Sequence, residues 1–151
     1  MDILRKVPHA ARPLVGPRRK GQTSVIVHDE YDAQDFVHQA LRLVYPDTRL
    51  EEVVPSFAGA STRTNFPIKV ESTVIEVKVT RKGRSEKAIR DEIIVEQRAY
   101  GEHPSVKRLI AVVYDLVGNF SNIAGFEADL SKPSAGNLEN IVIVERWPEA
   151  T

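Results

Sequence analysis

The sequence contains no cysteine, one methionine, one tryptophan and no long apolar run. Without cysteine, a disulfide framework, cysteine-ligated zinc, an iron–sulfur cluster and a thiol nucleophile are all excluded. The longest apolar run, Leu109 to Tyr114, is six residues long, whereas a membrane-spanning helix needs roughly 20. No apolar stretch follows Arg5 and Lys6 as in a secretory signal, so we expect a cytoplasmic protein with no membrane association.

Charge of neither sign is in excess, because 21 Lys and Arg residues balance 21 Asp and Glu residues. The charges are nevertheless segregated. Residues 1–20 hold six basic residues and one acid, residues 28–52 hold seven acids and two basic residues, and residues 76–90 hold six basic residues and two acids. This pattern suits a polyanion that is cut with the help of a cation, since Lys and Arg hold phosphates while carboxylates hold the metal. The alternative is an ordinary solvated surface.

With 151 residues, 42% of them hydrophobic, the chain has the size of one domain with a substantial core. Pro8, Pro13 and Pro17 lie among basic residues near the N-terminus and disfavour regular structure there. We therefore expect a basic arm or linker over residues 1–24 and a single domain over residues 25–151.

Apolar periodicity and turn signals predict helices and strands that alternate along this domain. The expected elements are a helix from Glu30 to Tyr45 behind the N-cap Asp29, a short strand at Val53–Phe57, a loop at 58–61, strands at Phe66–Val70 and Thr73–Thr80, a helix from Ser85 to about Glu102, a buried strand at Leu109–Tyr114, a short helix at Phe126–Leu130 and a last strand at Ile141–Val144. This order predicts an α/β layered domain with a mixed sheet.

Polar residues converge on one face of the predicted hairpin. If residues 71–72 form its loop, Asn65 lies opposite Lys78. Pro67 then lies opposite Glu76. Because side chains alternate along a strand, Asn65, Glu76 and Lys78 would share one face, and the apolar residues between them would face the core.

A Glu-x-Lys pattern on a strand can form part of a metal-dependent phosphodiester hydrolase. Magnesium prefers hard oxygen ligands, and Glu76 would supply one. Lys78, two residues later on the same strand face, would hold the attacking water and offset the charge that develops on the phosphate. The same pattern is also common on half-exposed surface strands.

Three segments extend this pattern: residues 58–66 together with 74–83, Asp29 to Phe36, and Val112 to Asp115. In order and spacing, over roughly residues 18 to 130, they resemble the PD-(D/E)XK nucleases, in particular the domain family named for the DpnII and MboI restriction enzymes. The resemblance implies a restriction-endonuclease-like mixed central sheet flanked by helices. It further implies a DNA endonuclease that uses Mg²⁺, for which Mn²⁺ can substitute, in restriction or phage defence.

The resemblance implies Asn65, Glu76 and Glu30 as metal ligands and Lys78 as the residue that handles the water. The family has a metal-binding aspartate where this sequence has Asn65, immediately before Phe66. An amide offers a neutral oxygen and brings NH₂ donors that repel a cation, so metal affinity should fall. The change is either engineered, a natural weakening, or compensated by another carboxylate. The candidates for compensation are Glu30, Asp29, Glu92 and Glu96.

Two further features have both a functional and a structural interpretation. Glu30 looks like the family's additional helix acid, but it would also complement the dipole of the helix that it begins. Glu92 and Glu96 lie one turn apart, where they would orient Lys78 or a water, or simply form a solvated helix face.

The basic residues around the proposed site would contact DNA phosphates, which position nucleic acid without reading its sequence. They are Arg63, Arg81, Lys82 and Arg84. We expect DNA as the partner, with a homodimer and a partner protein or domain of a defence system as further options. Tyr100 and Trp147 are assigned to structural roles. The alternative function is a catalytically inactive nucleic-acid-binding or regulatory interaction module with the same fold.

Overall fold

The computed structural model describes residues 2–49, 52–54, 62–64, 66–68, 71–133 and 136–149, with the backbone alone for 52–54 and 62–64. Its centre is a four-stranded sheet in the order β3-β4-β5-β6. These strands are β3 (Phe66–Ile68), β4 (Thr73–Val79), β5 (Arg108–Asp115) and β6 (Glu139–Arg146). The last three run parallel, and β3 is antiparallel to β4, so the sheet is mixed. A separate antiparallel pair consists of β1 (Glu52–Val54) and β2 (Thr62–Thr64).

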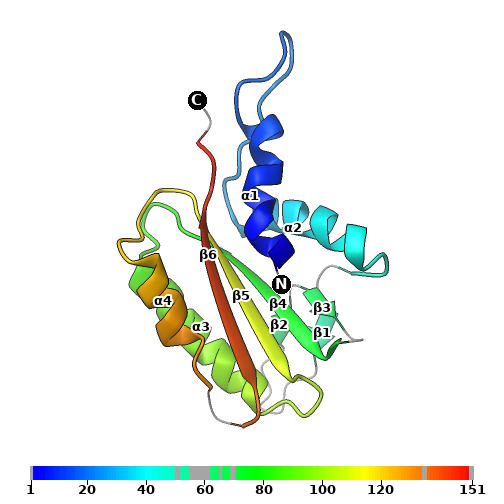
Figure 1. Ribbon diagram of the computed structural model, residues 1–151, viewed down its shortest axis with the longest axis vertical. Helices are drawn as coiled ribbons and strands as arrows, with labels where there is room; N and C mark the ends of the chain where they lie inside the picture. The colour runs from blue at the N-terminus through cyan, green and yellow to red at the C-terminus, as the bar shows by residue number, and fades with distance from the viewer. Residues whose placement is uncertain are drawn as a thin grey trace.

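Helices cover both faces of the four-stranded sheet. They are α1 (Asp2–Val15), α2 (Glu30–Val44), α3 (Glu86–Gly101) and α4 (Ile123–Leu130). Figure 1 shows α1 and α2 on one side of the sheet and α3 and α4 on the other. The α/β class with a mixed central sheet flanked by helices is therefore confirmed. Within the described ranges, no helix is both long enough and apolar enough to cross a membrane.

The two helices nearest to the proposed site begin at the N-caps that the sequence indicates. Asp29 accepts a hydrogen bond from the backbone N of Asp32 at 3.0 Å, and Ser85 accepts one from the backbone N of Ala88 at 3.2 Å. Each cap satisfies an amide that has no partner inside its own helix. The first turns of α2 and α3, which carry acidic residues, are thereby fixed.

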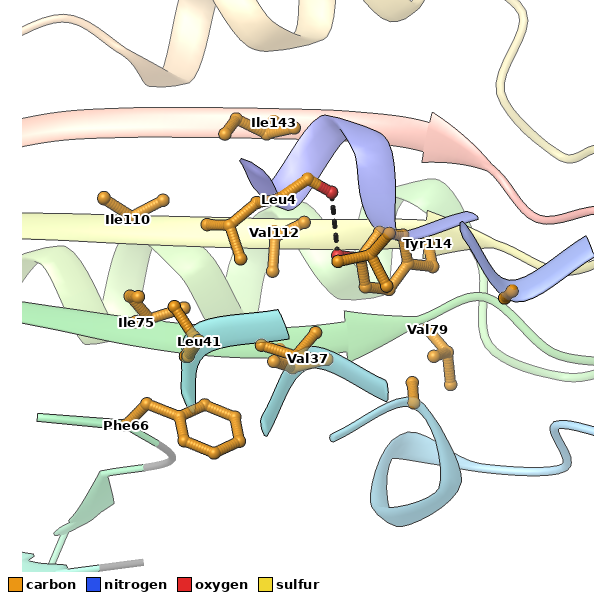
Figure 2. Close-up of a cluster of buried hydrophobic side chains, with 14 of the residues drawn as sticks. Leu4, Val37, Leu41, Phe66, Ile75, Val79, Ile110, Val112, Tyr114 and Ile143 are labelled. Carbon is orange, nitrogen blue, oxygen red and sulfur yellow. Dashed lines mark hydrogen bonds between the residues drawn. The ribbon is translucent and has the colours of Figure 1, made fainter. Parts of the chain in front are cut away.

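The position of β5 in the middle of the sheet explains why its sequence is almost uniformly apolar. Ile110, Val112 and Tyr114 belong to the core cluster beneath α1 and α2, which Figure 2 shows. Ala111 and Val113 belong to the cluster beneath α3 and α4. A parallel strand that is covered on both faces needs apolar residues at every position, as expected.

The irregular structure expected near the N-terminus is wrong for residues 2–15, which form α1. The residues missed by the proline-based prediction form one apolar stripe. They are Leu4, Val7, Ala11 and Val15, all buried in the core cluster with α2 and the sheet. From residue 16 to residue 24, where every residue is described, there is no helix or strand, as expected.

A contact from β5 explains how α1 accommodates a proline. Pro8 has no N–H to donate to the carbonyl of Leu4, four residues earlier. The hydroxyl of Tyr114 donates to that carbonyl instead, at 2.9 Å, as the dashed line in Figure 2 marks. The buried acceptor is thereby satisfied. Local sequence predicts the missing hydrogen bond but not the distant residue that replaces it.

The predicted register between β3 and β4 is wrong by two residues. Pro67 pairs with Val74, not with Glu76, and Phe66 pairs with Ile75. Ile68 pairs with Thr73, so four residues separate these paired positions instead of the assumed two. Because the shift is even, the assignment of β4 side chains to the two faces is unchanged.

Several predicted boundaries also differ. The helix expected at Phe126 begins at Ile123, and the last strand is longer at both ends than expected. The strand β2 was not predicted. The loop expected at residues 58–61 lies outside the described residues.

Candidate active site

From Glu76 onwards, the face of β4 that points towards α3 is polar and buried. Glu76 and Lys78 are each 5% exposed, and Thr80, just beyond the strand, is 0% exposed. The alternating residues Ile75 and Val77 point to the opposite face and its apolar cluster. The alternation expected from the sequence is thus confirmed, and β4 brings Glu76 and Lys78 to one face.

Lys78 is held by two carboxylates from α3. Its Nζ atom donates to Glu96 Oε1 at 2.6 Å and to Glu92 Oε2 at 3.3 Å. The lysine side chain is 6% exposed, against 20% for Glu96 and 44% for Glu92. The two glutamates lie on one face of α3 because they are one turn apart. Of the two interpretations left open for them, the geometry fits the one in which they orient Lys78.

Glu76 is held by Tyr100, which lies one turn beyond Glu96 on α3. The Tyr100 hydroxyl donates to Glu76 Oε1 at 2.7 Å. Burial and the adjacent carboxylate of Glu76 raise the pKa of Tyr100, so its hydroxyl remains a donor. Sequence reasoning assigned Tyr100 to structure alone. The i, i+4 spacing of Glu96 and Tyr100 places both on one stripe of the helix, but it does not show that this stripe meets Glu76 and Lys78.

Arg84 connects this face to the first turn of α2. Its guanidinium donates to Glu30 Oε1 through one nitrogen and to Glu92 Oε2 through the other. The Arg84 side chain is 14% exposed. Glu30, the first residue of α2, therefore joins the site through Arg84. Arg84, expected to contact DNA phosphate, pairs with protein carboxylates here.

These contacts form one continuous charged cluster. Its members are Glu30, Glu76, Arg84, Lys78, Glu92 and Glu96. Four carboxylates against two cations leave a formal excess of two negative charges.

The pKa shifts within the cluster reflect burial and the neighbouring charges. Burial lowers the pKa of Lys78, but Glu96, Glu92 and Glu76 outweigh it, and the net pKa is raised. Lys78 therefore stays an ammonium at neutral pH. Burial raises the pKa of Glu96, Lys78 opposes this, and Glu92 and Glu30 raise it further. Burial is the largest single cause at both groups, and the neighbouring carboxylates raise both pKa values.

A basic turn follows β4 directly. Arg81, Lys82 and Gly83 are exposed, and Gly83 has a φ of +85°, a conformation that glycine adopts readily. The turn closes through a hydrogen bond from Arg84 N to Arg81 O at 2.9 Å. Together with Glu30 and Glu92, these residues line an open depression of about 750 Å³. Positive groups therefore lie at the rim of the charged cluster.

Asp115 holds the start of this turn in place. The hydroxyl of Thr80 donates to Asp115 Oδ1 at 2.6 Å. Backbone amides of Gly118, Asn119 and Phe120 also donate to the same carboxylate. Burial raises the pKa of Asp115, but the hydrogen bonds outweigh it, so the net pKa is lowered. The ends of β4 and β5 are thereby joined beside the basic turn.

Three residues named from the sequence are not placed at the site by a described side-chain contact. Asn65 lies outside the described residues, and for Arg63 only the backbone is described. Asp29, one candidate for compensating Asn65, accepts the capping hydrogen bond of α2.

The donor set fits a divalent cation in chemistry and charge, since carboxylate oxygens are hard ligands and the cluster has excess negative charge. Within the described parts of the chain, no group of three or more His, Asp or Glu side chains is arranged to hold a metal ion. The carboxylates of Glu30, Glu92 and Glu96 contact Arg84 and Lys78 instead.

Comparison with known proteins identifies the family. Residues 2–146 match the model of the family described as REase_DpnII-MboI. Neither the curated proteins nor the solved structures include a match. Restriction endonucleases generally use a divalent metal, and membership indicates a DNA-cleaving hydrolase. Because the match covers almost the whole chain, the protein belongs to the DpnII-MboI restriction endonuclease family.

Proposed function

We propose that the protein is a DNA endonuclease domain that hydrolyses phosphodiester bonds with Mg²⁺, for which Mn²⁺ can substitute. The observation that carries the proposal is the buried polar face of β4. It presents Glu76 and Lys78 side by side in a cluster with excess negative charge. Burying charged groups away from water is costly, and buried charged clusters are concentrated at functional sites.

In this proposal Glu76, position 65 and Glu30 hold the ion. When bound, the ion would polarise the phosphate and lower the pKa of a water molecule. Lys78 contributes a fixed positive charge. Its ammonium donates hydrogen bonds that hold the attacking water, and it offsets the charge that develops on the phosphate.

Asn65 weakens this site. Replacing an aspartate by an amide removes one anionic ligand, so we propose that the chain as written binds the metal poorly and cuts DNA slowly or not at all. A compensating carboxylate would have to come from the charged cluster, where Glu92 and Glu96 already pair with cations.

The basic turn and Arg63 are proposed to contact the DNA backbone. Arg81 and Lys82 are exposed beside the charged cluster, whereas Arg84 supports Glu30 and Glu92. The strength of phosphate contacts depends on salt. A plot of log affinity against log salt has a negative slope, and each contact that is lost reduces the magnitude of that slope by about one. Replacing both Arg81 and Lys82 with serine should therefore reduce that slope by about two.

The setting of the activity is also part of the proposal. We propose a cytoplasmic restriction or phage-defence role, in which two copies pair so that each cuts one strand. A further protein or domain of the same system is the other partner that we consider.

The decisive experiment compares the chain as written with its Asn65→Asp variant. Both are incubated with supercoiled, linear and single-stranded DNA in EDTA, Mg²⁺ or Mn²⁺. We expect the Asn65→Asp variant to cut duplex DNA in either metal and Lys78→Ala to abolish that cutting. Lys132→Ala is the matched control. Lys132 is 71% exposed and pairs with Asp129 of α4, not with a residue of the charged cluster.

Other outcomes would revise the proposal. Equal cutting by both forms would mean that another carboxylate compensates for Asn65. No cutting by either form, together with DNA binding that needs no metal and weakens steeply with salt, would favour the inactive nucleic-acid-binding module. Indifference to DNA at any salt concentration would favour the regulatory interaction module.

A further inference from the structure

One turn of α3 matches two residues of β4. Tyr100 contacts Glu76, and Glu96 contacts Lys78, so the helix runs antiparallel to the strand. Four residues of an α-helix rise about 6 Å. Two residues of a strand rise about 6.6 Å. Consecutive polar side chains on the helix therefore meet consecutive polar side chains on the strand.

The helix that carries these two contacts is fixed on the sheet. Ile89 and Ile93 are fully buried in the cluster beneath α3 and α4. The side chain of Gln97, between Glu96 and Tyr100, donates from Nε2 to the backbone oxygen of Leu130 at 2.6 Å. Side chains projecting from such a helix have little freedom to move away from β4.

Three of the four side chains are also shielded from water, and the fourth, Glu96, is 20% exposed. Tyr100 is 3% exposed, and Glu76 and Lys78 are each 5% exposed. Water competes weakly for a buried charged group, so its orientation depends on the protein groups around it.

We propose that Tyr100 and Glu96 act as a pair of positioning residues on α3, with the Tyr100 hydroxyl orienting the Glu76 carboxylate and the Glu96 carboxylate orienting the Lys78 ammonium. The inference rests on the proposed function, since it assigns these residues a role in the same site. Neither is a catalytic residue, because each acts through its partner on β4. Fixing both groups before substrate binds removes an entropic cost from the binding and chemical steps.

The Tyr100 contact is tested through metal affinity in the Asn65→Asp protein. Mn²⁺ binding is followed by the loss of the free Mn²⁺ signal in electron paramagnetic resonance. Removing a partner that orients a metal ligand typically weakens binding 10-fold to 100-fold, so we expect Tyr100→Phe to weaken Mn²⁺ binding at least about 10-fold. Glu76→Ala locates the ion, because binding at the proposed site should then be lost.

Tyr45→Phe is the matched control. It removes the same hydroxyl from another tyrosine–glutamate pair, in which Tyr45 donates to Glu71 at 2.6 Å outside the charged cluster. We expect its Mn²⁺ affinity to equal that of the parent. If Tyr100→Phe binds Mn²⁺ as tightly as Tyr45→Phe does, the positioning role of Tyr100 is overturned.

The Glu96 contact is tested without metal, by nuclear magnetic resonance of lysine ammonium groups. A buried, hydrogen-bonded ammonium exchanges slowly and gives a cross peak, which Lys78→Met assigns by its disappearance. We expect Glu96→Ala to abolish the Lys78 peak and Glu96→Gln, which keeps an acceptor, to retain it. Glu139→Ala, which removes an exposed partner of Arg108, should leave it unchanged.

Persistence of the peak in Glu96→Ala would overturn the role of Glu96. If Mn²⁺ does not bind the Asn65→Asp protein, or still binds after Glu76→Ala, the proposed metal site fails. The role of Tyr100 fails with it, while the ammonium peak still decides the role of Glu96. If Mn²⁺ binds at Glu76 but Tyr100→Phe changes nothing, the nuclease proposal stands and the role of Tyr100 fails alone.

Discussion

The two faces of β4 are equally buried and chemically opposite. Every residue from Thr73 to Val79 is buried. On one face Ile75 and Val77 pack against α1 and α2, and on the other Glu76 and Lys78 meet polar side chains of α3. Burial of the apolar face stabilises the fold. Burial of the polar face costs hydration free energy, and ion pairs and hydrogen bonds offset part of that cost.

This difference separates the part of the sheet that stabilises the fold from the part that is available for chemistry. An apolar β4 on both faces would satisfy the packing of a parallel sheet with no need for ion pairs. The polar face therefore points to function. The charged cluster compensates its buried charges with ion pairs. Substitutions on the two faces should have different signatures.

The largest loss of stability is expected on the apolar face. Ile75→Ala removes a fully buried side chain and leaves a cavity, and should lower the free energy of unfolding by about 4 kcal/mol. Ile94→Ala is the control at an exposed position of α3, with an expected loss below about 1 kcal/mol. Urea unfolding followed by circular dichroism measures both. Equal losses would contradict the assignment of Ile75 to the core.

A single change on the polar face should be almost as damaging, yet reversible by a second. Glu96→Leu removes the nearer partner of buried Lys78 and should lower the free energy of unfolding by about 3 kcal/mol. Adding Lys78→Met should restore or exceed the parent stability, because an apolar pair replaces a buried ion pair at no desolvation cost. The four proteins form a double-mutant cycle measured by urea unfolding. A double variant no more stable than Glu96→Leu would contradict this account.

The hydrogen bond between Tyr114 and Leu4, within the core cluster beneath α1 and α2, should have an intermediate effect. Tyr114→Phe leaves the Leu4 carbonyl without its donor and should lower the free energy of unfolding by about 2 kcal/mol. In a Pro8→Ala background the backbone N–H of residue 8 can bond to Leu4, so the same substitution should cost less. Thermal unfolding of the four combinations tests this. Identical costs in both backgrounds would exclude the compensation of Pro8 by Tyr114.

The smallest effect is expected at Asp115, and it depends on pH. Hydrogen bonds hold the folded-state pKa of Asp115 below its ordinary value of 3.8, so its stabilisation is present above about pH 4 and is lost as pH falls through the folded-state pKa. Asp115→Asn should lower the free energy of unfolding by about 1.5 kcal/mol at pH 7. The difference from the parent should shrink below pH 4. Asp129→Asn, at a side chain 57% exposed, should show neither effect.

Features governed by local interactions were predictable from the sequence. The caps Asp29 and Ser85 were found because a side chain bonds to an amide three residues later. The two faces of β4 follow from the alternation of side chains along a strand. The register with β3 was missed because it depends on the length of the connecting loop, which the sequence left open.

The candidate site was predictable in part for the same reason. Glu76 and Lys78 are two residues apart, so one strand face unites them whatever surrounds it. The role of Tyr100 depends on where α3 lies on the sheet, and its spacing from Glu96 does not reveal that. Arg84 was expected at DNA because an exposed basic turn suits phosphate, but two carboxylates from different helices engage its side chain.

The sequence by itself determined the class of the fold, the alternation along β4 and the family, because these depend on periodicity, caps and ordered motifs. The tertiary structure decided that α1 forms despite Pro8, that Arg84 joins Glu30 to Glu92, and that α3 holds the polar face of β4. The physical reason is that hydrogen bonds and ion pairs between distant residues depend on how elements pack. No local pattern encodes that arrangement.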